Sequence, residues 1–137
     1  MSQRILDSLN FLLSSSDFVE LKENESIKID LRYASANNFV GYDMYGPFRQ
    51  AFLHRLAADK LFRSLAALRA NHPGYGFIIF DALRPRSVQR ILWDNVKGTK
   101  SERYIANPDL GSLHNFGFAV DLTIMDEKGN ELDMAPS

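Results

Sequence analysis

The segment GFIIFD, residues 76–81, decides how the rest of this sequence is interpreted. Its four consecutive large apolar residues leave no polar face. That pattern is typical of a strand with both faces covered by other parts of the protein. The run ends at Asp81, and the segment ALRPRS follows. The pattern predicts a central β-strand with a carboxylate at its end.

Helical patterns flank this strand. Residues 49–71 carry an apolar stripe at helical spacing and end in the stop signal Asn71-His72-Pro73-Gly74. The stripe consists of Leu53, Ala57, Leu61, Leu65 and Leu68. A second helix is predicted from Val88 to Val96, closed by Gly98, and a shorter amphipathic helix over residues 3–14.

Three further segments indicate strands: residues 18–21, 27–33 and 118–125. In the second of these, apolar and polar side chains alternate, which suits a half-buried strand. Strands and helices do not follow a regular βαβ rhythm. We therefore expect an α+β fold with a small, mainly antiparallel sheet packed with helices. A length of 137 residues favours a single domain, residues 1–137.

Composition excludes several classes of function. Lys and Arg number 16 against 17 Asp and Glu, without a basic stripe, so we expect no nucleic-acid partner. The chain contains no cysteine, which excludes disulfides, a thiolate nucleophile and a Cys-type zinc site. No stretch approaches the roughly 20 apolar residues of a membrane span. We expect no membrane partner and a cytoplasmic location, or a periplasmic one if a leader was removed.

The segment GSLHNFGFAVDLT, residues 111–123, holds a histidine and an aspartate around a glycine. In a strand, Ala119, Asp121 and Thr123 share one face. A bend at Gly117 can fold His114 back over Asp121, so that both could bind a zinc ion. The alternative is a surface histidine and an aspartate that satisfies nearby backbone groups. The spacing of the two residues leaves both interpretations open.

Four segments in the same order resemble the zinc D-alanyl-D-alanine dipeptidases, the VanX-type peptidases of family M15. The first two are Asp30-Leu31-Arg32-Tyr33-Ala34-Ser35-Ala36-Asn37-Asn38-Phe39 and Phe80-Asp81-Ala82-Leu83-Arg84-Pro85. The third is the Ser-x-His-x-x-Gly-x-Ala-x-Asp-Leu-Thr pattern of residues 112–123, and the fourth is Glu131-Leu132-Asp133-Met134. The chain departs from the family pattern at Leu83, where Tyr is usual, and at Asn115-Phe116, where Ser-Arg is frequent.

The resemblance implies a role for each of six residues. His114 and Asp121 are expected to be ligands of Zn²⁺. Arg84 is expected to be catalytic by stabilising the oxyanion, and its alternative is a structural ion pair with Asp81. Substrate contacts are expected from Ser112, Tyr33 and Asp81. Their alternatives are a loop-capping hydroxyl for Ser112, a core aromatic for Tyr33, and for Asp81 an orienting role beside Arg84.

The resemblance also implies a third zinc ligand and a general base from a later Glu-x-x-His segment. No such segment follows Asp121, and neither His54 nor His72 belongs to one. We expect His54 to lie inside the long helix and both histidines to be surface residues. Three explanations are possible: the chain is truncated, another subunit completes the site, or the chain is a degenerate relative that has lost catalysis. We favour truncation, in which a second chain or a lost C-terminal fragment carries the missing ligand.

The resemblance predicts zinc-dependent hydrolysis of a small dipeptide such as D-alanyl-D-alanine, with an incomplete site in this chain. The alternative from another class is a non-catalytic or degenerate relative that binds cell-wall peptides. A third possibility is a carboxypeptidase for longer stem peptides.

Overall fold

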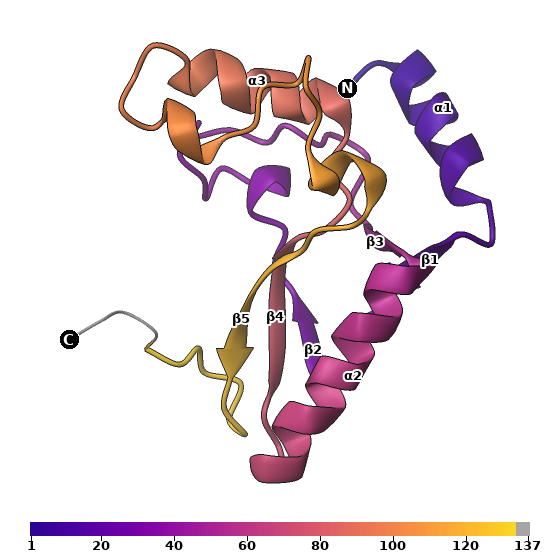
Figure 1. The fold of residues 1–137 in the computed structure, drawn as a ribbon, viewed down its shortest axis with the longest axis vertical. Coiled ribbons are helices and arrows are strands. Elements are labelled where there is room, and N and C mark those ends of the chain that lie inside the picture. The colour runs from indigo at the N-terminus through magenta and orange to yellow at the C-terminus, as the bar shows by residue number, and fades with distance from the viewer. Residues whose placement is uncertain (134–137) are drawn as a thin grey trace.

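The computed structural model describes residues 1–133. Its elements follow the chain in the order of Figure 1. The helices are α1 (Gln3–Leu13), α2 (Arg55–Asn71) and α3 (Arg86–Val96), and three short 3₁₀ helices are η1 (Arg32–Ala34), η2 (Glu102–Tyr104) and η3 (Leu113–Phe116). The strands are β1 (Phe18–Leu21), β2 (Ile27–Ile29), β3 (Ala51–His54), β4 (Gly76–Asp81) and β5 (Asp121–Met125). This confirms the α+β class.

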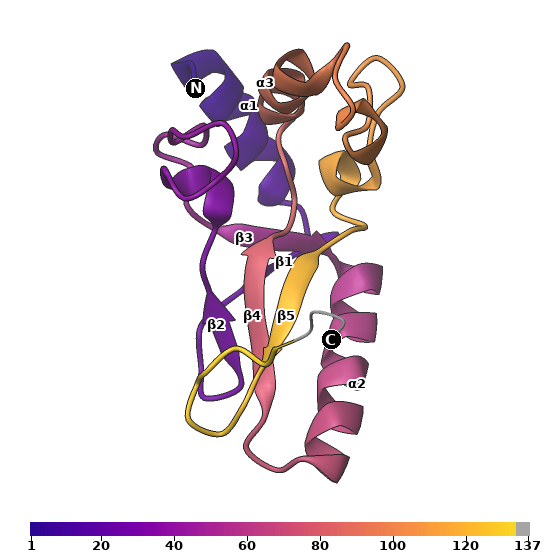
Figure 2. The ribbon, with the colours of Figure 1, turned by 90° about the vertical axis from the view of Figure 1, so that its left-hand side faces the viewer.

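The strands form two sheets instead of one. β1 pairs antiparallel with β3, while β4 lies between β2 and β5 in a three-stranded sheet. β4 pairs parallel with β2 and antiparallel with β5. The expectation of a central strand over residues 76–81 is therefore confirmed. Figure 2 shows α2 alongside this sheet, and it shows α1 and α3 grouped together beyond one end of the sheet.

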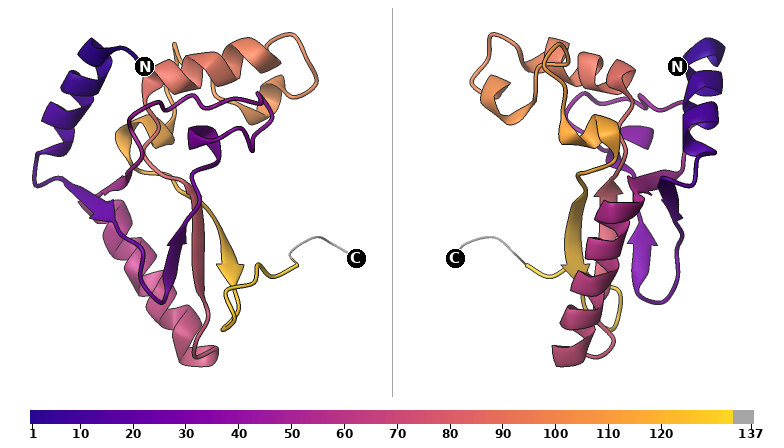
Figure 3. Two further views of the ribbon diagram at one scale, coloured as in Figure 1. Left: turned by 180° about the vertical axis from the view of Figure 1, so that it is seen from behind. Right: turned by 45° about the vertical axis from the view of Figure 1, so that its right-hand side comes forward.

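Two apolar clusters stabilise the fold, one between α2 and the two sheets and the other under α1 and α3. The first joins α2 to both sheets and is built from Leu21, Ile27, Ala51, Leu53, Ala58, Leu61, Leu65, Phe77, Ile79 and Ala82. The second lies under α1 and α3 and is built from Leu9, Leu13, Ala34, Met44, Tyr45, Phe48, Leu83, Val88 and Leu92. The views in Figure 3 show the chain passing between these regions where β3 leads into α2 and β4 leads towards α3. The functional residues described below lie at this junction.

The long helix begins at Arg55, six residues later than the predicted start at residue 49. Residues 51–54 form β3, in which Ala51 and Leu53 are buried, whereas Phe52 and His54 are half-buried. Leu53 therefore fits a helical stripe and an alternating strand equally well, and the hydrogen bonds from β1 decide in favour of the strand. His54 is consequently not inside the helix: its Nδ1 caps α2 by accepting from the N–H of Leu56.

Two predicted strands are shorter than expected. The segment 27–33 is a strand only to Ile29, and Leu31 then accepts from the N–H of Ala34 as η1 begins. β1 and β2 do not pair with each other, because β1 belongs to the sheet with β3. The segment 118–125 becomes a strand only at Asp121.

No helix within residues 1–133 has both the length and the hydropathy that a bilayer crossing needs.

Replacing Gly76 by alanine is expected to destabilise the protein by about 2 kcal/mol, through overpacking. A Cβ at this position would lie 2.2 Å from the carbonyl oxygen of Ser26 and 2.9 Å from Cε of Met125. The first of these atoms belongs to the backbone and cannot move without disturbing the β2–β4 pairing. Urea denaturation measures the loss. Ser64→Ala, at an exposed position of α2, is the control and should change stability by less than about 0.5 kcal/mol, and a loss that small in Gly76→Ala would contradict the clash.

Candidate metal centre

Asp81, His114 and Asp121 converge at the end of β4. One ligand atom from each of them lies within 4.8 Å of the other two. β4 and β5 are antiparallel, and an irregularity between Ile79 and Asp81 places Asp81 directly opposite Asp121. The sheet thus sets two carboxylates side by side, while η3 supplies the imidazole.

The imidazole of His114 is held in one orientation. Its Nδ1 lies 3.0 Å from the carbonyl oxygen of Ala82. Because a carbonyl can only accept, Nδ1 donates to it, and Nε2 is the ring nitrogen that faces Asp121. That Nε2 lies 3.4 Å from Oδ1 of Asp121. A proton on Nε2 makes the hydrogen bond to Asp121, and a metal ion in place of that proton would have both atoms as ligands.

The bend at Gly117 brings His114 into this position, as the sequence indicates. Gly117 has φ 76° and ends η3. A Cβ there would lie 2.8 Å from the backbone nitrogen of His54, so only glycine permits this close approach. At the other end of η3, Ser112 and Asn115 form a capping box.

Arg84 is buried and connects the two carboxylates. Its Nε donates to Oδ2 of Asp81 at 2.8 Å, and its Nη2 lies 3.3 Å from Oδ2 of Asp121. Only 5% of Arg84 is exposed. The ring of Tyr33 lies 5.2 Å from its guanidinium carbon, which permits a cation–π contact. The structural alternative, an ion pair with Asp81, is therefore present, and the catalytic role of Arg84 stays a prediction.

The electrostatics agree with this geometry. The hydrogen bond from His114 holds the pKa of the Asp121 carboxyl below its usual range against partial burial, and Arg84 acts in the same direction. Burial raises the pKa of the Asp81 carboxyl, and Arg84 opposes that shift. Burial disfavours the charge on Arg84, yet Asp81 keeps the pKa of its guanidinium above the usual value. We infer that the pair Asp81–Arg84 is ionised, because both carboxylate oxygens accept hydrogen bonds.

Tyr45 is a member of the site that sequence reasoning missed. Its hydroxyl donates to Oδ1 of Asp81, and its ring is buried in the second apolar cluster. Burial, with Asp81 next, raises the pKa of this hydroxyl well above its usual value, so Tyr45 stays a neutral donor. Residues 34–48 contain several aromatic side chains, so the sequence does not single out Tyr45.

The turn that carries Tyr45 depends on Asp43. Its Oδ1 accepts from the N–H groups of Tyr45 and Gly46, and its Oδ2 pairs with Arg49. Burial raises the pKa of Asp43, but these backbone donors and Arg49 outweigh it, so the pKa of this carboxyl lies below its usual value. The folded state therefore favours the ionised form of Asp43.

Asp43→Asn is expected to lower the free energy of unfolding at pH 7 by about 1 kcal/mol. A lowered folded pKa contributes stability that is complete above the unfolded pKa of about 3.9. That stability is lost as pH falls through the folded pKa. The difference between wild type and variant should therefore shrink below about pH 4, as measured by urea denaturation across pH. A difference that stays constant down to low pH would contradict the shift.

Gln89 is the second member that the sequence did not reveal. It is fully buried on α3, accepts from Nη1 of Arg84 at 2.8 Å and donates to the carbonyl oxygen of Ala106 at 2.7 Å. It thereby connects Arg84 to the loop that leads to η3. A glutamine five positions after an arginine carries no distinctive sequence signal.

Gln89→Leu should lower the free energy of unfolding by about 2 kcal/mol, because it leaves a buried guanidinium N–H and the carbonyl of Ala106 without partners. Thermal or urea denaturation gives the value. Gln50→Leu, at an exposed position, is the matched control and should change stability by less than about 0.5 kcal/mol. Equal effects in the two variants would show that the buried amide contributes nothing specific.

The remaining predicted residues lie near this centre. The Oγ of Ser112 accepts from the N–H of His114 at 3.2 Å, so the capping alternative is present, and the expected substrate contact stays a prediction. Tyr33 is half-buried beside Arg84, and burial raises the pKa of its hydroxyl. His72 is exposed and its ring stacks on Tyr75, and it is not one of the residues that converge at the candidate metal centre. Met134, the last residue of the fourth segment, lies outside the described residues.

Comparison with known proteins agrees with the residues assembled here. The family model of the D-ala-D-ala dipeptidases, Peptidase_M15, matches residues 14–136. The chain belongs to this family. It is also 36% identical to the D-alanyl-D-alanine dipeptidase of Escherichia coli (strain K12) over 108 residues, which is 79% of this chain and 53% of that protein. The chain thus spans about half the length of the curated relative that it matches.

Two departures from the dipeptidase family pattern have structural explanations. Leu83 is 3% exposed and packs in the second apolar cluster, where an apolar side chain is accommodated. Asn115 donates from Nδ2 to the carbonyl oxygen of Arg84 at 2.8 Å and accepts from the N–H of Ser112. It therefore holds together the two segments of this dipeptidase-family chain that carry the centre.

Proposed function

We propose that this chain supplies the larger part of a zinc-dependent dipeptidase site that hydrolyses D-alanyl-D-alanine or a similar dipeptide. Membership of the dipeptidase family supports the reaction. The observation that carries the proposal is the pair of possible ligand atoms, Nε2 of His114 and Oδ1 of Asp121, held face to face at 3.4 Å. Such a pair is suited to a metal ion.

The donor set fits zinc. A neutral imidazole and a carboxylate are ordinary zinc ligands, and the hydrogen bond from Nδ1 to Ala82 is the type of support that orients a ligating histidine. Both oxygens of Asp81 already accept from Tyr45 and Arg84. We therefore assign Asp81 to orientation of Arg84 and leave His114 and Asp121 as the two ligands.

Zinc, when bound, supplies a Lewis acid that polarises the scissile carbonyl and activates water. The other contributions come from the protein. Arg84, fixed by Asp81 and Gln89, presents a permanent positive charge that can stabilise the oxyanion of the transition state. Tyr45 keeps Asp81 in place without exchanging a proton, because its hydroxyl stays neutral.

Ser112 and Tyr33 are proposed to bind the substrate. The Oγ of Ser112 accepts one hydrogen bond, and its own hydrogen has no acceptor among residues 1–133. That hydrogen is free to donate to a substrate carboxylate. Tyr33 provides a ring against the guanidinium side of the site.

The general base and the third zinc ligand are not assigned to this chain. Glu-x-x-His, expected from the resemblance, occurs nowhere in the 137 residues. We propose that these groups come from a further segment or a second chain. Mass measurement of the protein isolated from its source tests this step, because 15.6 kDa without any associated chain contradicts it.

Zinc titration combined with an assay for D-alanine release tests the function. Stoichiometric zinc binding with hydrolysis of D-alanyl-D-alanine and not of L-alanyl-L-alanine is the expected result for the protein as isolated from its source. Zinc binding without hydrolysis would replace the proposal by a non-catalytic cell-wall-peptide-binding protein. Faster release from a longer peptide ending in D-alanyl-D-alanine would indicate a carboxypeptidase.

A further inference from the structure

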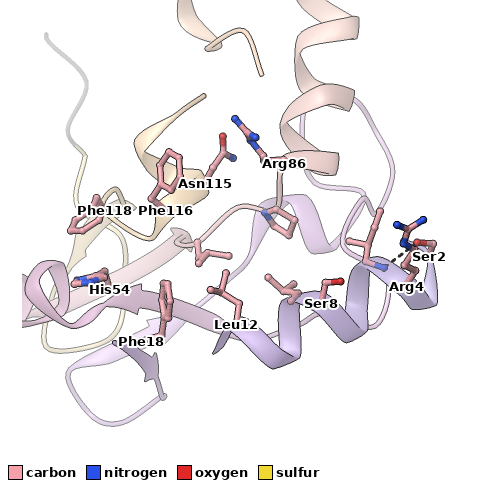
Figure 4. A pocket seen from close by; sticks show the side chains of 14 residues that line it. Ser2, Arg4, Ser8, Leu12, Phe18, His54, Arg86, Asn115, Phe116 and Phe118 are labelled. Carbon is pink, nitrogen blue, oxygen red and sulfur yellow. Dashed lines mark hydrogen bonds between the residues drawn. The ribbon is translucent and has the colours of Figure 1, made fainter. Parts of the chain in front are cut away.

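A groove of about 840 Å³ lies between α1 and the segments around β3 and η3. Figure 4 shows α1 along one side of it, and Arg86, Asn115 and Phe116 along the other. Its volume falls within the range of small-molecule sites. None of Asp81, His114 and Asp121 lines it, so it is a separate feature from the candidate metal centre.

The groove owes one wall to a helix outside the family match. The match begins at residue 14, whereas α1 ends at Leu13. Ile5, Leu9 and Leu12 form an apolar stripe along α1, which is roughly 16 Å long. The groove is therefore a property of this chain that the family match does not cover.

The interior of the groove is apolar and aromatic. At one end, the ring of His54 stacks on Phe118 at 4.5 Å, and Phe18 meets its edge at 5.8 Å (Figure 4). Phe116 and Phe118 are 55% and 44% exposed, so their rings present apolar surface to water. Covering these rings removes apolar surface from water and favours a ligand with an apolar body.

The charged groups at the groove are both cations. Arg4 and Arg86 line it, and neither has an ion-pair partner among residues 1–133. Among the described residues, no aspartate or glutamate lines the groove. The Nδ1 of His54 accepts from the N–H of Leu56, so its Nε2 carries a hydrogen and is a further donor. The groove is therefore complementary to an anion with acceptor atoms.

We propose that this groove binds a small anionic amphiphile, a monocarboxylate with an apolar chain. Its carboxylate would lie near Arg4 or Arg86 and its chain along α1 towards the aromatic end. A peptide suits the groove less well, because its backbone amides need partners. The amide of Asn115, which could provide them, already bonds to Arg84 and Ser112.

Calorimetric titration with octanoate and with octan-1-ol tests the proposal, because the two probes share a chain and differ in charge. Octanoate should bind at least about tenfold more tightly than octanol, since charge-assisted hydrogen bonds are stronger than neutral ones. The double variant Arg4→Gln/Arg86→Gln should abolish that difference while octanol binding stays unchanged. Both arginines are exposed, so the variant should fold, and circular dichroism verifies this.

Two more variants complete the test. Leu12→Asp, which adds an acid to the apolar wall, should abolish octanoate binding, whereas Arg63→Gln, on the exposed side of α2, should leave it unchanged. Equal affinity for octanoate and octanol, or octanoate binding unchanged by the double variant, would overturn the proposal. So would a dimer in sedimentation that Leu12→Asp dissociates, because a second copy would then be the occupant. Zinc binding should be the same in all three variants, so failure here is independent of the proposed dipeptidase function.

Discussion

Arg84→Met should destabilise the protein by about 3–5 kcal/mol, the largest effect that we expect from a single substitution. The variant leaves Asp81, which is 1% exposed, buried without its cation. It also removes the donors to Gln89 and Asp121. A methionine fills the space but cannot compensate a buried carboxylate. The free energy of unfolding from urea denaturation measures the loss.

The control for Arg84→Met is Arg63→Met, which removes an ion pair between two side chains that are each more than 60% exposed. That variant should change stability by less than about 0.5 kcal/mol. A double variant, Arg84→Met/Asp81→Leu, should recover part of the loss, because no charge is then left uncompensated. A loss below about 1 kcal/mol in Arg84→Met would show that Asp81 and Arg84 do not form a buried pair.

Asp121→Asn and His114→Ala should each weaken zinc binding by at least about 100-fold. Loss of a residue that only supports a ligand weakens metal binding by up to about 100-fold, and loss of a ligand itself should have at least that effect. Each substitution removes one of the two possible ligand groups that face each other at 3.4 Å. Competition with a chromophoric chelator measures the affinity. The variants should also bind cobalt without the absorption bands of a tetrahedral site.

His72→Ala serves as the matched control for these ligands, since His72 is exposed and contacts only Tyr75 through its ring. Its zinc affinity should equal that of wild type. If His114→Ala kept wild-type affinity while His72→Ala lost it, the metal site would have to be sought elsewhere in the chain. Circular dichroism of each variant shows whether a loss of binding reflects loss of the ligand or of the fold.

Segments with one dominant periodicity were predictable from the sequence. The strand at residues 76–81 has the predicted bounds, because its apolar run allows no amphipathic alternative. The segment 49–54 was assigned wrongly to a helix. There, Leu53 satisfies both periods, and the deciding partner, β1, lies more than thirty residues earlier in the chain. Local patterns contain no information about such a partner.

Some residues of the candidate site could be predicted from the sequence and others could not. The convergence of His114, Asp121 and Arg84 could be anticipated because their motifs lie at the ends of predicted elements and resemble those of the family. Tyr45 and Gln89 could not. Tyr45 lies 36 positions before Asp81, and Gln89 bonds to a backbone carbonyl, so their roles depend on how the loops pack.

The position of β4 between β2 and β5 has a consequence for biosynthesis. Ile27 pairs with Phe77 and Gly76 with Met125, so each neighbour of the central strand lies about fifty positions away along the chain. Such distant partners slow folding, because long loops must close before the strands meet. While the nascent polypeptide is still on the ribosome, β2 and β4 can associate early, but β5 cannot join them until Met125 has left the exit tunnel. Asp121 reaches its place opposite Asp81 in that same event, so the two carboxylates of the site meet only after β5 has joined the central strand.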